Sequence, residues 1–167
     1  MFLAAVFGLT AGAMADNLVK NGEFEKLDAK GVPVGWTMTV SKGATFKAVT
    51  GGAPDGGSVT FTLPENGSFS FRQVITQAVK PNTKYKVSFK VRGKNFKAAT
   101  LGMIFINEGW TKSNGNKKLK VTPEWKEYKE IYTTPDFKKI AAITFYANKA
   151  SGTVELCDVE VEALDND

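Results

Sequence analysis

The sequence predicts an all-β fold, an antiparallel β-sandwich or jelly roll, and three features support this prediction. Apolar and polar residues alternate through most of the chain after residue 34. Turn-forming pairs, among them Gly51-Gly52, Asn114-Gly115 and Ser151-Gly152, separate the alternating runs. No run shows the period of an amphipathic helix. Roughly nine or ten strands at this spacing are typical of two packed antiparallel layers.

Each alternating run is expected to turn one face to the core. In "FSFRQVI", residues 69–75, three apolar residues and Gln73 share one face, and Arg72 projects from the other. The runs "KYKVSFKVR", "WKEYKEIYTT" and "TVELCDVEV" follow the same pattern. Two further runs, "TLGMIFIN" and "IAAITFYAN", are apolar or aromatic on both faces. One of those faces meets the core, so the other is expected to cover something else, such as a ligand groove.

The first fifteen residues differ from the rest of the chain. Residues 1–15 carry no charge and end in a small-x-small pattern around Met14, which predicts a secretory signal cut before Asp16. We therefore expect one domain at 16–167, secreted or periplasmic in a bacterium. No other run approaches the ~20 apolar residues of a membrane span.

Composition excludes several classes of function. The 167-residue chain contains no histidine, so an imidazole-based triad and the usual transition-metal sites are excluded. The single cysteine, Cys157, lies in an apolar run and is interpreted as a small buried hydrophobe. The formal net charge of +5 favours anionic partners. No nucleic-acid-binding motif is present, so nucleic acid is not an expected partner. Two carboxylates across a groove would still permit glycoside hydrolysis, and the sequence does not place such a pair.

Five segments in order resemble a known family. They are "NLVKNGEFE", "GVPVGW", "RQVITQAVKPNTKYKVSFKVR", "VTPEWKEYKEIYTT" and "VELCDVEV". Together they resemble the carbohydrate-binding modules of the family 4/9/22 type, which are galactose-binding-like jelly rolls. The resemblance implies a non-catalytic protein, not an enzyme, that binds a polysaccharide or oligosaccharide on a concave sheet face or a rim loop. The alternative is a scaffold jelly roll of the cell envelope that contacts other proteins and binds no sugar, because this fold hosts both roles.

The resemblance also implies a structural calcium between the first strand and the last. Glu25 matches the closing glutamate of the first motif, and Glu23 is expected to point the same way when Phe24 turns inward. Asp158 lies in the matching last-strand motif, where Cys157 replaces an acid of the family pattern. Two outcomes stay open, because calcium needs six to eight hard oxygens and a thiol is a poor ligand. Either Glu25 and Asp158 still bind calcium, or the site is lost and the carboxylates stay solvated.

The sugar-binding residues are also expected by resemblance. Similar modules use arginine, amide and tyrosine side chains on the concave sheet, and the candidates here are Arg72, Asn107, Trp110, Tyr146 and Asn148. The two remaining tryptophans, Trp36 and Trp125, match framework positions and are expected to pack in the core. Trp110 lies in a polar loop, where it contacts either a ligand or the body of the fold.

Four lysines follow Trp110 closely: Lys112, Lys117, Lys118 and Lys120. Such a cluster is often only a solvated loop. If Trp110 belongs to the site, these lysines favour acidic glycans, and binding is then expected to fall steeply with salt.

Overall fold

The computed structural model describes residues 17–108, 112–136 and 141–164, and its regular elements within these ranges are all strands. They are β1 (Thr37–Val40), β2 (Thr45–Ala53), β3 (Gly56–Val74), β4 (Lys84–Glu108), β5 (Lys112–Lys118), β6 (Lys126–Thr133) and β7 (Ala142–Ala163). Every pairing between them is antiparallel. The all-β jelly-roll prediction is therefore confirmed.

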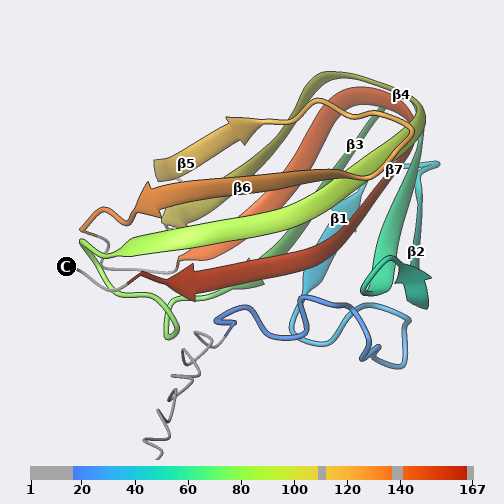
Figure 1. Ribbon diagram of the computed structural model, residues 1–167. Coiled ribbons are helices and arrows are strands. Elements are labelled where there is room, and N and C mark those ends of the chain that lie inside the picture. The colour runs from blue at the N-terminus through green and yellow to red at the C-terminus, as the bar shows by residue number, and fades with distance from the viewer. Residues whose placement is uncertain (1–16, 109–111, 137–140, 165–167) are drawn as a thin grey trace, which may run out of the picture.

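Three strands are long enough to serve two layers (Figure 1). β3 pairs with β2 over residues 56–62 and with β1 over residues 69–72. β4 pairs with β6 over residues 84–91 and with β5 over residues 102–108. β7 pairs with β3 over residues 142–156 and with β4 over residues 144–163. One layer, named the β2/β6 layer, therefore has the order β2-β3-β7-β4-β6, and the other, named the β1/β5 layer, has the order β1-β3-β7-β4-β5.

Residues with left-handed backbone lie where these strands pass between the layers. Asn66 in β3, Asn95 in β4 and Gly152 in β7 have φ values of 59°, 52° and 86°, a region that asparagine and glycine tolerate best. A Cβ on Gly152 would lie 2.2 Å from the carbonyl oxygen of Asn95, so the two bends are in close contact. The predicted turn at Ser151-Gly152 is thus a bend inside one strand. Several runs predicted as separate strands are halves of β4 and β7, which explains the higher expected number.

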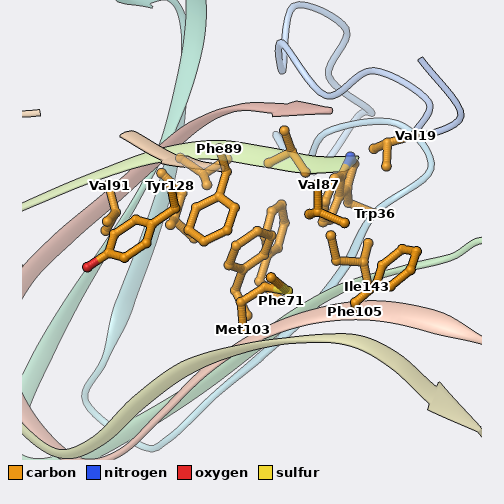
Figure 2. Close-up of a cluster of buried hydrophobic side chains, with 14 of the residues drawn as sticks. Val19, Trp36, Phe71, Val87, Phe89, Val91, Met103, Phe105, Tyr128 and Ile143 are labelled. Atoms are coloured by element: carbon orange, nitrogen blue, oxygen red, sulfur yellow. The ribbon is translucent and has the colours of Figure 1, made fainter. Parts of the chain in front are cut away.

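The core lies between the layers (Figure 2). Residues of β4 and β6 in the β2/β6 layer face β3, β4 and β7 residues of the β1/β5 layer, as the alternation predicted. Aromatic rings dominate the contact: Phe89 stacks on Tyr128 at 5.3 Å and meets Phe145 edge-on at 5.0 Å, between centroids. Trp36, from the loop before β1, stacks on Phe71 at 4.5 Å. Such pairs add to the free energy gained from burial itself.

The amino-terminal segment lies alongside β7 and completes the fold. The backbone N–H of Leu18 donates to the Val161 carbonyl at 2.8 Å, and the N–H of Val159 donates to the Gly22 carbonyl at 3.1 Å. Gln73, predicted to face the core, is buried and forms two 2.7 Å hydrogen bonds with the backbone of Lys20. A buried amide needs such partners, so Gln73 fixes this segment against β3.

Candidate functional site: the outer face of the β1/β5 layer

Strand register brings two rows of side chains onto the outer face of the β1/β5 layer, because residues directly opposite one another share a face. The first row contains Thr37, Arg72, Thr144, Ile104 and Asn116. The second row contains Thr39, Ser70, Tyr146, Gly102 and Lys118. These two rows are named the central rows. Each crosses five strands, which corresponds to about 19 Å at the usual strand spacing.

Tyr146 forms a flat aromatic surface on this face. A Cβ on Gly102 of the neighbouring strand would lie 2.9 Å from Tyr146 Oη and 3.0 Å from its Cε1. The phenol ring therefore lies across Gly102, and its hydroxyl donates to Asn116 Oδ1 at 3.4 Å on β5. The side chain is half-buried. An aromatic ring held along the sheet in this way offers a surface on which the apolar side of a sugar ring can stack.

Hollows lie at both ends of the second central row. At the β1 side, a cavity of about 270 Å³ is lined by Thr39, Ser70 and the exposed Asn148, among others. At the β5 side, a cavity of about 220 Å³ is lined by Thr100, Lys118 and mainly apolar neighbours. Since Asn148 pairs with Thr100 in the sheet, the two hollows are joined by a continuous strip of polar side chains.

Three of the five predicted sugar-binding residues lie on this face. Arg72 and Tyr146 occupy adjacent central rows, and Asn148 follows Tyr146 on the same side of β7. Asn107 pairs through its backbone with Ser113 of β5, but its side chain is not among those described. Trp110 lies outside the described residues. The use of any of them in binding stays a prediction.

Sequence reasoning missed other members of the central rows. Asn116 directly follows the predicted Asn114-Gly115 turn, but this stretch belongs to β5, and Asn116 pairs with Ile104 of β4. Thr144 is only 6% exposed, and its Oγ1 has no hydrogen-bond partner within the described ranges. No periodic pattern marks β5, because its sequence KSNGNKK is polar on both sides. Only the register with β4 reveals which of its side chains share the face of Tyr146.

The charges of the central rows are all positive among the side chains described. Arg72 and Lys118 lie in the rows, and no carboxylate does. The predicted lysine cluster divides around the β5 backbone: Lys117 faces the other way and forms an ion pair with Glu130 of β6. Lys120 is exposed beyond the end of β5. The face therefore favours negatively charged ligands.

The two framework tryptophans have different environments. Trp36 is buried, as predicted, and its indole N–H donates to the Lys20 carbonyl at 3.2 Å. Trp125 is only half-buried, which differs from the prediction of core packing. The guanidinium of Arg92 lies 4.5 Å from the centre of its ring on the outer side of the β2/β6 layer. Trp125 is therefore held by a cation–π contact at the surface.

Two of the three residues expected to bind calcium have protein partners. The Asp158 carboxylate lies 2.8 Å from the Lys90 ammonium, and Glu25 Oε1 accepts a hydrogen bond from the Gly51 N–H at 3.3 Å. Glu23 lines a cavity of about 130 Å³ together with Asp158 and Lys90, and Glu25 is not among the residues that line it. Hydrogen bonds from the Lys90 ammonium to the carboxylates of Asp158 and of Asp55, in the turn between β2 and β3, raise the pKa of Lys90.

Two observations on calcium point in opposite directions. Asp158 Oδ1 is buried and has no hydrogen-bond partner among the described residues, which a metal would supply. However, burial raises the pKa of the neighbouring Cys157 to about 12, with a smaller effect from Asp158, so this thiol is neutral and offers no hard oxygen. The adjacent ammonium would also repel a dication. Within the described ranges, no group of three or more acids, cysteines or histidines could hold a metal ion. The carboxylates and the thiol by themselves therefore supply too few hard oxygens for calcium.

Fold and face together define a class of protein: a jelly-roll module with a polar, aromatic-bearing sheet face. A family comparison gives the same result. The CBM_4_9 model, the carbohydrate binding domain, matches residues 16–153, and the chain belongs to this family.

Three solved structures with the same fold are 18–19% identical to this chain in sequence. A CBM4 structure has a TM-score of 0.65 at 19% identity, with 87% of this chain and 99% of that chain covered. The module TmCBM61 in complex with β-1,4-galactotriose also has a TM-score of 0.65 at 19% identity, and the match covers 90% of this chain and 100% of that chain. The enzymatically active domain of tailspike protein 4 from bacteriophage CBA120 has a TM-score of 0.67 at 18% identity. This match covers 89% of this chain but only 21% of that chain. At such identities the likeness establishes the fold.

A search of curated proteins finds no match. The part of the chain that the structure describes contains no helix of the length and apolar character needed to cross a membrane.

Proposed function

We propose that this protein is a secreted, non-catalytic module that binds an acidic polysaccharide across the central rows. The observation that carries the proposal is the chemistry of this face. It combines the flat ring of Tyr146, hydrogen-bonding side chains and the cations Arg72 and Lys118, without a carboxylate among the described members of the rows. The planar guanidinium of arginine suits both carboxylates and pairs of hydroxyls.

The shape of the face favours a chain bound along its length. The hollows at the two ends of the second central row are connected by polar side chains on β7 and β4. The row spans about 19 Å, longer than one sugar ring, so several adjoining residues of a glycan can contact it at once. We infer that the ligand runs perpendicular to the strands and continues past both edges of the layer.

The absence of acids from the described central rows also supports a non-catalytic role. Glycoside hydrolysis normally uses two carboxylates on opposite sides of the scissile bond. In the described ranges, the carboxylates Glu155, Asp158, Glu160 and Glu162 lie on β7 in the other layer, where most have basic partners.

The known relatives are consistent with sugar binding. The matching family is a carbohydrate binding domain, and TmCBM61 was solved with β-1,4-galactotriose. The galactotriose bound by TmCBM61 is neutral, so the proposed acidic preference rests on the charges of this chain.

Affinity electrophoresis tests the proposal directly. Native protein is run in gels that contain polygalacturonate, alginate, xylan or galactan, at low and high salt. We expect retardation by the acidic polymers that decreases steeply with salt, because exposed charges are screened. Arg72→Ala and Trp110→Ala should lose retardation. Arg92→Ala, on the other layer, is the control and should keep it.

Three outcomes would contradict the proposal. Equal retardation at both salt concentrations would remove the acidic preference. Absence of retardation by every polymer, together with self-association in solution, would instead indicate a scaffold. Release of oligosaccharides from any polymer would indicate an enzyme.

A further inference from the structure

Lys90 connects three separate parts of the β2/β6 layer. It lies on β4, and its ammonium forms ion pairs with Asp55, in the β2–β3 turn, and with Asp158 of β7. These side chains are unequally accessible: Asp158 is 13% exposed, Lys90 22% and Asp55 65%. The Lys90–Asp158 pair is therefore largely shielded from water, where attraction between charges is stronger.

A bulge in β7 directs Asp158 toward Lys90. Between the pairs Ser88↔Glu160 and Lys90↔Cys157, β7 has one residue more than β4. Asp158 takes a left-handed φ of 51° at this bulge, a conformation uncommon for residues other than glycine. Bulges of this kind redirect a side chain. The backbone is thus shaped to bring a carboxylate onto the lysine.

The amino-terminal segment passes the same place. The Glu23 carbonyl accepts the N–H of Gly57 at 2.8 Å, at the start of β3, and the Gly22 carbonyl accepts the N–H of Val159, next to Asp158. Glu23 lines the cavity around Lys90. The ion pairs of Lys90 therefore lie where the first segment, β3, β4 and the last strand converge.

We propose that the ammonium of Lys90 is the structural cation of this protein, holding the β2–β3 turn and the β7 bulge together so that the fold needs no calcium. Cys157 is consistent with this arrangement. A carboxylate at this fully buried position, next to Asp158, would add a third negative charge beside the one Lys90 ammonium, in a place where an unpaired charge is costly. A neutral thiol leaves Asp158 and Asp55 as the carboxylates paired with Lys90.

Thermal unfolding with and without calcium tests this inference. For the native protein, the Tm should be the same within about 1 °C in chelator and in millimolar calcium chloride, since nothing binds the metal. Lys90→Met keeps the length of the side chain and removes its charge, and should lower the Tm by about 5 °C or more. Lys90→Arg restores a cation and should recover most of this loss.

Lys86→Met is the matched control. Lys86 lies on the same face of β4 and pairs with one carboxylate, Glu162, but connects no third segment. The Tm of the Lys86→Met protein should fall by no more than about 2 °C, because a surface ion pair contributes little to stability. A Lys90→Met protein as stable as Lys86→Met would overturn the inference. So would a calcium-dependent rise in the Tm of the native protein, a measurement that remains valid even if Lys90→Met fails to fold.

Discussion

The two outer faces of the sandwich use charge differently. On the β2/β6 layer, basic residues of β4 pair with acids of β7: Lys86 with Glu162, and Arg92 with Glu155 at 2.8 Å. On the β1/β5 layer, the central rows carry Arg72 and Lys118 and no described carboxylate. Both faces belong to the same three long strands, so the difference does not come from backbone architecture. On the β2/β6 layer these basic residues of β4 are paired with acids of β7, whereas the described members of the central rows include cations and no acid.

The largest expected effect comes from removing the aromatic surface of the β1/β5 layer. Tyr146→Ala should weaken binding to an acidic polysaccharide by about tenfold or more, the size typical of an aromatic hot spot. The measurement is retardation in affinity gels or isothermal titration calorimetry with oligosaccharides. Ile131→Ala removes an exposed hydrophobic side chain from the opposite face and is the control. Equal affinity of the two variants would contradict the role of Tyr146.

Reversing one charge should have the next largest effect. Lys118→Glu places an acid in the second central row, and we expect about fivefold weaker retention at low salt, with a smaller difference at high salt because the charges are screened. Lys129→Glu makes the same change on β6 of the other layer. If it weakens binding as much as Lys118→Glu, the effect is one of net charge and the distinction between the faces is lost.

A smaller effect is expected from displacing Tyr146 without removing it. A Cβ at Gly102 would lie 3.0 Å from the Lys117 carbonyl oxygen as well as 2.9 Å from Tyr146 Oη. Gly102→Ala should therefore shift the ring and weaken glycan binding by roughly threefold, less than its removal. Near-ultraviolet circular dichroism would report the altered ring environment. An unchanged affinity would mean that the position of the ring is unimportant.

The smallest effect is predicted for a paired charge of the β2/β6 layer. Glu155→Gln removes the ionic partner of Arg92, both side chains being partly exposed, and should lower the free energy of unfolding by about 0.5 kcal/mol. Denaturant titration measures this change. Glycan affinity should be unaffected, and a clear loss would show that the two faces are coupled.

Local patterns predicted much of the fold. The alternation in "KYKVSFKVR" correctly assigned Tyr85, Val87, Phe89 and Val91 to the core, and Trp36 is buried as expected. The order of five motifs correctly indicated the carbohydrate-binding family. Trp125 was placed less well, because its contact with Arg92 depends on where a different strand lies.

The sequence by itself determined the all-β class and which side of the clearly alternating strands is apolar, since alternation is a local property with a period of two. Only the tertiary structure decided that Ser151-Gly152 is a bend within β7, that Asn116 lies beside Tyr146, and that Lys90 meets Asp158. Each of these depends on the register between strands distant in sequence. A shift of one residue would reverse the faces, and no short segment specifies that register alone.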